Sequence, residues 1–160
     1  MAAQRGVYTV SFSEQTIANA SGDYDLFELV PADDRPIELV ALYLGNKSEV
    51  ADAQDEMLSI NIITDYTTSS NGSATTPRPL DPRDGAAGFS AETLGATVAN
   101  TGTPITVHAD TFNVRAGLQL ILPEFMRPKV DQADTAMYIR LTSAVADDLT
   151  LSGTAYIREL

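Results

Sequence analysis

The chain has 160 residues, no cysteine, and 22 acidic against 10 basic residues, for a formal net charge of −12. A single domain of this length, here residues 1–160, buries roughly 70% of the surface of its unfolded chain, so a core can form without disulfides or a thiolate metal site. Because phosphate backbones and anionic lipids repel such an acidic surface, nucleic acid and membranes are excluded as expected partners.

No targeting or membrane segment is expected. The first residues, MAAQRGVYTVSF, have no long apolar run after a basic start, which a secretory signal needs. The longest apolar run, residues 39–44, is far too short to span a bilayer.

Strand patterns separated by polar turns fill the first part of the chain. Residues 7–12 and 24–30 contain alternating or closely spaced aromatic and branched side chains, as strands do. Residues 37–44 are apolar on both faces, which predicts a strand covered on both sides, by another layer of the same chain or by a neighbouring subunit. Residues 57–65 place alternate leucine and isoleucine side chains on one predicted core face.

Residues 45–56, between two of these strands, are ambiguous. Ser48 can cap a short helix, yet the acidic residues favour a loop with one helical turn. Asp52, Asp55 and Glu56 lack the alternating oxygen ligands and central glycine of a calcium loop, so we interpret them as part of a solvated turn.

The stretch from residue 67 to residue 88 reads TTSSNGSATTPRPLDPRDGAAG, with three prolines and almost no apolar side chain. Loops of this length are uncommon in compact domains and are usually functional or disordered. We hypothesise that it is an ordered arm that contacts another subunit, and the alternative is a loop that folds back onto its own domain. The candidate contact residues are the stiffening prolines and the two arginines: Pro77, Arg78, Pro79, Pro82 and Arg83.

The second half of the chain begins with weaker signals. Residues 90–94 can form a single helical turn, and Ile105 and Val107 mark a short strand. Residues 112–125, FNVRAGLQLILPEF, are the most strand-like apolar segment and are predicted to form a core strand. Pro123 cannot donate to a central ladder, so pairing should end there.

Two further strands close the chain. Residues 137–141 alternate apolar and polar side chains, and residues 149–158 do so almost without exception, as in an antiparallel strand buried on one face. Arg115, a further candidate contact residue, lies where the 112–125 strand should begin and can pair with a neighbouring acid or stay solvated. Short strands joined by turns, without a sustained helix, predict an all-β fold, an antiparallel β-sandwich that is jelly-roll-like and carries one long ordered loop.

No catalytic constellation is visible in the sequence. The one histidine, His108, lies at an alternating strand position near Asp110 and is interpreted as structural. No glycine pattern for nucleotide binding occurs, one histidine without cysteine does not favour zinc, and the 22 acids single out no pair for glycoside hydrolysis. We therefore expect no enzymatic activity, no cofactor and no metal.

Four motifs occur in a characteristic order: DEML before an isoleucine-rich strand at 55–63, AAGF at 86–89, FNVRAGLQLILPE at 112–124 and LSGTAYIRE at 151–159. This order resembles virion structural proteins of tailed bacteriophages. The resemblance implies a capsid decoration or cement protein, or a minor head or tail protein. It carries no catalytic signature, so no functional residue is transferred to this chain.

Within this group, a decoration protein on the capsid exterior is the favoured function. A charge of −12 facing packaged DNA would oppose the phosphate charge, which favours the exterior. The expected partners are the major capsid protein and copies of the chain itself, as a homotrimer. The alternatives are a minor tail or neck protein of the same virion, and a carbohydrate-binding attachment module, although the chain has no tryptophan for a sugar platform.

Overall fold

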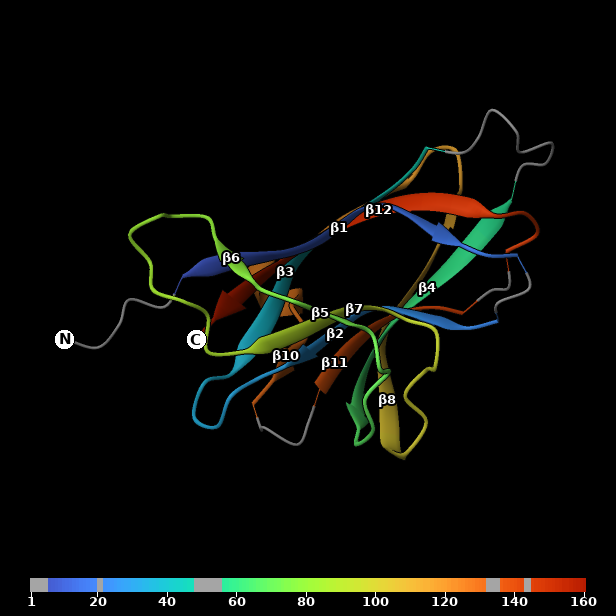
Figure 1. Ribbon diagram of the computed structural model, residues 1–160. Coiled ribbons are helices and arrows are strands. Elements are labelled where there is room, and N and C mark those ends of the chain that lie inside the picture. The colour runs from blue at the N-terminus through green and yellow to red at the C-terminus, as the bar shows by residue number, and fades with distance from the viewer. Residues whose placement is uncertain (1–5, 20–21, 48–55, 132–135, 143–144) are drawn as a thin grey trace.

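Two antiparallel sheets pack face to face in the computed structural model, which describes residues 6–19, 22–47, 56–131, 136–142 and 145–160 (Figure 1). Sheet A runs in the order β10-β3-β12-β1-β6, and β9 also pairs with β3. Its strands are β1 (Val7–Ile17), β3 (Ile37–Asn46), β6 (Arg78–Pro79), β9 (Leu118–Ile121), β10 (Lys129–Val130) and β12 (Leu149–Glu159).

Sheet B runs in the order β5-β7-β2-β11-β4-β8. Its strands are β2 (Tyr24–Val30), β4 (Met57–Tyr66), β5 (Ser73–Thr75), β7 (Ser90–Gly95), β8 (Gly102–Asn113) and β11 (Ala136–Leu141). One short 3₁₀ helix, η1 (Glu124–Met126), lies between β9 and β10.

Eight of these strands follow the jelly-roll connection, in which the chain crosses repeatedly between two sheets. In chain order they are β1, β2, β3, β4, β8, β9, β11 and β12. Counted in that order, sheet A places the first, eighth, third and sixth strands side by side, and sheet B the second, seventh, fourth and fifth. The predicted all-β, jelly-roll-like sandwich is therefore confirmed, and β5, β6, β7 and β10 are additions to it.

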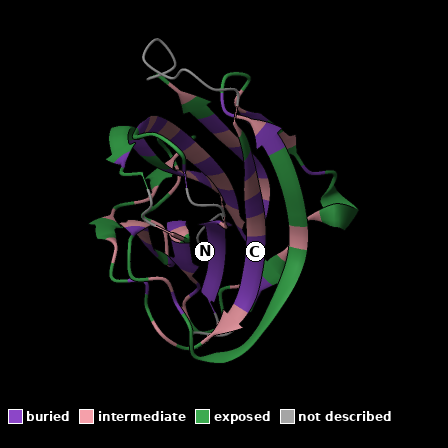
Figure 2. Ribbon diagram, turned by 90° about the vertical axis from the view of Figure 1, so that its right-hand side faces the viewer, coloured by how far each residue is buried: buried purple, intermediate pink, exposed green. Residues whose placement is uncertain are grey.

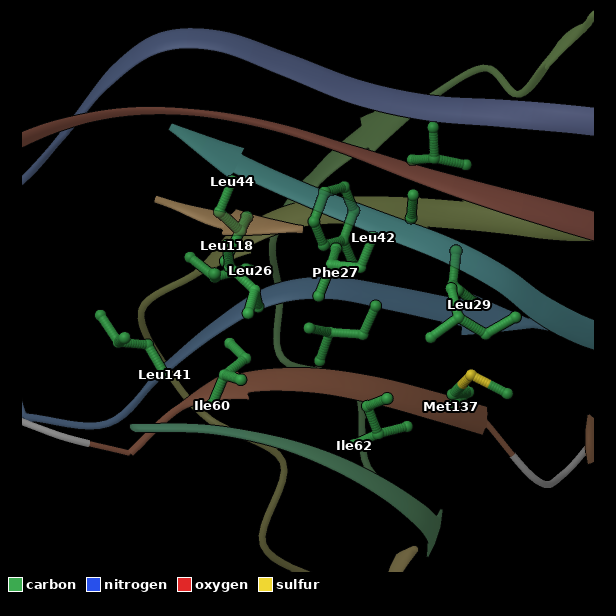
Figure 3. Close-up of a cluster of buried hydrophobic side chains, with 14 of the residues drawn as sticks. Leu26, Phe27, Leu29, Leu42, Leu44, Ile60, Ile62, Leu118, Met137 and Leu141 are labelled. Carbon is green, nitrogen blue, oxygen red and sulfur yellow. The ribbon is translucent and has the colours of Figure 1, made fainter. Parts of the chain in front are cut away.

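The core lies between the two sheets, where the inward side chains of each strand meet (Figure 3). The rings of Phe12 on β1 and Phe27 on β2 lie 5.2 Å apart between centroids, which places the sheets in direct contact. β12 alternates buried and half-buried residues along its whole length, as predicted. Each fully buried leucine, isoleucine or phenylalanine contributes about 1.5–3 kcal/mol relative to an exposed one, so this core accounts for the fold.

Two expectations about the second half of the chain are wrong. Residues 90–94 form no helical turn but belong to β7, which pairs with β2 and β5. Ladder pairing on both sides, with Ala91 and Thr93 buried, outweighs the weak local helical pattern. The strand marked by Ile105 and Val107 is not short, since β8 extends over 12 residues.

The predicted core strand at residues 112–125 is also corrected. Phe112 and Asn113 are the last two residues of β8, a turn follows, and β9 is a four-residue strand at the edge of sheet A. Gly117 makes the turn possible, because its φ is +71° and a Cβ there would lie 2.5 Å from the carbonyl oxygen of Leu44. Leu118 and Leu122 are buried as a core strand requires, and β9 ends before Pro123, as predicted.

β8 is the outermost strand of sheet B, and most of its residues are exposed along one side of the molecule (Figure 2). The ambiguous residues 48–55, with Ser48, Asp52 and Asp55, lie outside the described residues. Their predicted loop or helical turn therefore stays a prediction.

Candidate functional site

The predicted contact residues of the 67–88 stretch lie on or near the edge of sheet A. Arg78 and Pro79 form β6, which pairs with Thr9 and Tyr8 of β1. Pro77 precedes β6 and is half-buried. The stretch thus adds a short strand to its own domain here, and the role of these residues in a contact with another subunit stays a prediction.

Pro82 and Arg83 follow in an exposed turn. The Arg83 guanidinium lies 2.6 Å from the Asp81 carboxylate, and the hydrogen bonds that it donates lower the pKa of Asp81. Arg115 lies in the turn before β9 rather than beside a strand, and it is exposed. Arg83 therefore forms its ion pair inside its own turn. Arg115 and the residues of the 67–88 stretch lie in separate elements.

Two carboxylates hold the beginning of the 67–88 stretch on the outer face of sheet B. Glu28 of β2 is 4% exposed and accepts hydrogen bonds at 2.8 Å from both the backbone N–H and the hydroxyl of Ser70. Glu92 of β7 is half-buried and accepts one from the Gly72 backbone N–H at 3.0 Å. Since these bonds satisfy both the acids and the loop donors, this part of the stretch is ordered by its own chain.

A second acid on the same face, Asp25, holds the residues just before β8. Asp25 is fully buried and accepts bidentate hydrogen bonds from Arg140 of β11, at 2.6 and 3.0 Å. It also accepts one from the Ala99 N–H at 2.9 Å, while Arg140 donates to the Ala99 carbonyl. Burial opposes the positive charge of Arg140, but its hydrogen bonds and attraction to Asp25 outweigh burial and raise the pKa of Arg140. Loop residues from two segments therefore cover the outer face of sheet B.

The outer face of sheet A is different, because aromatic and apolar side chains point outward there. Tyr43 of β3 and Tyr156 of β12 pack edge to face, with ring centroids 5.7 Å apart. Ile121 of β9 lies opposite Ala41 and is 66% exposed. Cross-strand pairing puts these side chains on one surface.

A protruding loop, residues 122–128, extends this surface, and we call it the finger. Its base is fixed to β3 by two hydrogen bonds, from the Leu122 N–H to the Val40 carbonyl and from the Leu39 N–H to the Pro128 carbonyl. At its tip, Phe125 is 88% exposed and Met126 57% exposed. The finger is therefore an anchored support that presents two large apolar side chains.

A cluster of cations surrounds one buried acid at the base of the finger. Glu38 of β3 is fully buried, and its Oε1 lies 2.8 Å from both Arg127 and Arg158, while Lys129 lies 3.4 Å from its Oε2. Arg158 also donates to the Glu124 carboxylate at 3.2 Å. Because Arg158 points outward from β12, this bond places the finger over the outer face of sheet A.

This face lacks the acidic excess of the chain. Its strands and the finger carry four cations and four carboxylates, namely Arg78, Arg127, Lys129 and Arg158 and Glu14, Glu38, Glu124 and Glu159. Glu159 is buried on the same side of β12 as the core residues, which leaves four cations against three carboxylates on the outer face. Lys47, just beyond β3, lies 2.5 Å from Glu14. The chain as a whole has a charge of −12, so most of the acid lies elsewhere.

The same face is hollowed at the far end of β9 from the finger. An open recess of about 370 Å³ is lined by residues of β3, β9 and β12 and of the turn before β9, among them Tyr43, Gly45, Ala116, Gln119, Ser152 and Thr154. The backbone N–H of Glu14 bonds to the Ser152 hydroxyl, which places this acid beside the recess.

Sequence reasoning missed this face, although it predicted a strand at residues 37–44 that is apolar on both faces. The sequence did contain one signal for it. Strand pairing had to end at Pro123, yet Phe125 and Met126 follow, so no continuing strand could bury these two apolar side chains. Within the described ranges, no group of three metal-ligating side chains converges, and no helix has the length and apolarity to cross a membrane.

Comparison with known proteins gives no match: no protein-family model, no curated protein and no solved structure matches this chain.

Proposed function

We propose that the protein is a non-enzymatic structural protein of a tailed-bacteriophage particle, a decoration or cement protein on the capsid exterior. The observation that carries the proposal is the outer face of sheet A, where Ile121, Phe125 and Met126 stay exposed beside three cations. Exposed apolar groups rimmed by polar residues mark protein-binding surfaces. The order of sequence motifs supports the virion, and the surface supports a protein partner.

The construction of this surface suits a permanent scaffold. It stands on the edge strands of a jelly roll, and the finger is fixed at both ends to β3. A surface held in place before binding loses little conformational entropy when a partner arrives. A cement protein that stabilises a shell needs such a rigid contact.

The charge distribution supports an exterior position. The acidic excess of the chain repels packaged DNA, while the face with four cations against three carboxylates can approach another protein. The partners we propose are the major capsid protein and further copies of this chain, as a homotrimer. In this arrangement the acidic surfaces face the solvent.

Deletion of the gene tests the function directly. Particles without the protein should lose thermal and osmotic resistance, and particles with it should contain hundreds of copies. A handful of copies would assign the protein to the tail or neck instead. A cementing role would be contradicted if particles with the protein contain hundreds of copies and particles without it keep the same thermal and osmotic resistance.

Readdition to the deleted particles tests the surface. The double variant Phe125→Ser/Met126→Ser should fail to bind at concentrations that saturate with the unmodified protein. Ile105→Ser is the matched control, because Ile105 is also exposed, at 53%, but lies on β8 of sheet B. Equal binding of all three proteins would contradict docking through this face.

A further inference from the structure

We propose that copies of this chain associate by inserting Phe125 at the tip of the finger of one copy into the recess between β3, β9 and β12 of another. The occupant of the recess is thus a second copy. Every chain carries one finger and one recess on the same outer face, so a copy both donates and receives. The inference rests on the finger and recess, and it holds for any biological role of the protein.

The finger has the properties of a binding anchor. Phe125 projects almost completely into solvent at 88% exposure, next to Met126 at 57%. Such a side chain gains most of its apolar burial only when a partner covers it. The finger is also held in shape, since the Arg127 guanidinium donates both to the Leu122 carbonyl within the finger and to the buried Glu38.

The recess has the size and lining to receive a phenyl ring. Benzene occupies a cavity of about 150 Å³ in a protein core, and the recess measures about 370 Å³. Its lining residues include the apolar Leu118 and Tyr43, whose ring packs against Tyr156 on this face. Gly45 leaves one side open, because a Cβ built on it would have no atom within 4 Å.

The two elements lie at opposite ends of β9 on one continuous surface. Leu118 and Gln119 at the start of β9 line the recess, while Ile121 at its end leads into the finger. Tyr43 and Tyr156 form the surface between them. When a finger enters a recess, the exposed Ile121 and the tyrosine pair are therefore covered by the same contact.

The charge on this face permits contact between two copies, whereas the acidic remainder of the surface opposes it. Two chains of charge −12 repel at long range, but this face carries four cations against three carboxylates. Lys129 and Arg158 at the base of one finger approach the rim of the other recess, where the Glu14 carboxylate is more than half exposed. Opposite charges then meet at the edge of an apolar contact, as in the polar rim of interfaces.

Two single variants remove the contact from opposite sides. Phe125→Ser removes the anchor, and Gly45→Leu adds a side chain to the lining of the recess, at a position where a Cβ has no atom within 4 Å. Each should weaken association by at least about 30-fold, as loss of a central anchor does. Sedimentation velocity across a range of protein concentrations measures the effect, and Ile105→Ser, on β8 of sheet B, is the control that should associate like the unmodified chain.

A mixture of the two variants tests the pairing itself. The Gly45→Leu chain keeps its finger, and the Phe125→Ser chain keeps its recess, so the mixture retains one productive contact. An equimolar mixture should form a one-to-one heterodimer at concentrations where each variant alone is monomeric. A surface that merely sticks through its apolar groups would show no such recovery.

The outcomes separate clearly. Association of the unmodified chain, loss in both variants and recovery in the mixture support the proposal, whether the complex closes as a reciprocal dimer or as a ring. A chain that stays monomeric at millimolar concentration overturns it. Variants that associate as tightly as the control also overturn it. Circular dichroism melting of each variant shows that the fold is retained.

Discussion

The two outer faces of the sandwich are finished in different ways. On sheet B, the buried acids Asp25 and Glu28 bind the backbone of two loop segments and so draw them over the sheet. On sheet A, backbone bonds hold the base of the finger and Arg158 binds its Glu124, while Phe125 at the tip meets no such cover. Buried acids thus show that the chain closes one face itself, and on the other face we expect the exposed Phe125 to meet a partner.

The long 67–88 stretch and the short finger illustrate the difference. The long stretch is polar throughout, and its serine and backbone donors find carboxylates on its own sheet. The finger is short, but it carries large apolar side chains that no described element covers. Length alone therefore does not identify a binding arm, because the donors and acceptors of a polar loop can form their hydrogen bonds within the same chain.

The largest expected effect is on the closed face. Asp25→Ala leaves the guanidinium of Arg140, which is 5% exposed, without its carboxylate. Breaking a buried pair in this way costs about 3–5 kcal/mol of unfolding free energy. Urea unfolding measures the loss, and Asp81→Ala, which breaks only the exposed pair with Arg83, should leave the unfolding free energy nearly unchanged. Similar values for the two variants would contradict the description of this face.

A smaller effect is expected at Glu28. Glu28→Ala leaves the buried Ser70 backbone N–H without its acceptor, which costs about 1–3 kcal/mol. Amide hydrogen exchange at residues 69–72 should become faster than the global change in stability explains. Protection that is unchanged in this segment would show that another contact orders the loop.

Alkaline pH tests the same face through Tyr138. Burial, and next the negative charge of Glu28, raise the pKa of Tyr138 above its ordinary value of 10.0. The unfolded chain therefore loses this proton from about pH 10 while the folded chain keeps it. The contribution is complete below about pH 10 and declines above it by up to about 1.4 kcal/mol per pH unit.

Tyr138→Phe should make this alkaline decline shallower. The comparison is the difference in urea-unfolding free energy between about pH 8 and about pH 11 for the two proteins, because the remaining tyrosines contribute equally to both. A decline of the same steepness in the variant would contradict a raised pKa at this position.

The smallest effect is expected on the open face. Phe125→Ser should change the unfolding free energy of the dilute protein by no more than about 0.5 kcal/mol, since the ring is 88% exposed. Thermal melting at low concentration measures this. A loss of several kcal/mol would place Phe125 in the core of its own domain and remove the contrast between the faces.

Local pattern was enough to predict the strands whose alternation is complete. β12 extends the predicted segment by one residue, because alternation fixes one buried face wherever the strand lies in its sheet. β2 has the predicted bounds although it does not alternate and is buried on both faces. β7 was missed since its pairing with β2 and β5 depends on distant residues. The 112–125 segment was overestimated, because apolar content does not reveal that β9 is a sheet edge.

The candidate site was harder to predict for the same reason. Exposure of Phe125 follows from the place where β9 ends, and the cations around Glu38 come from three separate segments. The sequence identified Arg127 and Lys129 as neighbours but could not bring Arg158 to them. The contacts predicted for Pro77, Arg78, Pro79, Pro82, Arg83 and Arg115 stay predictions.

Oxidation of two methionines tests the central claim, that the outer face of sheet A is the docking face. Met126 of the finger and Met57 of β4 are each 57% exposed, so peroxide should convert both to the sulfoxide at comparable rates in the dilute protein. As the protein associates with itself or with particles, mass spectrometry should show protection of Met126 and continued oxidation of Met57. Equal oxidation of the two in the assembled state, or protection of Met57 alone, would contradict the account.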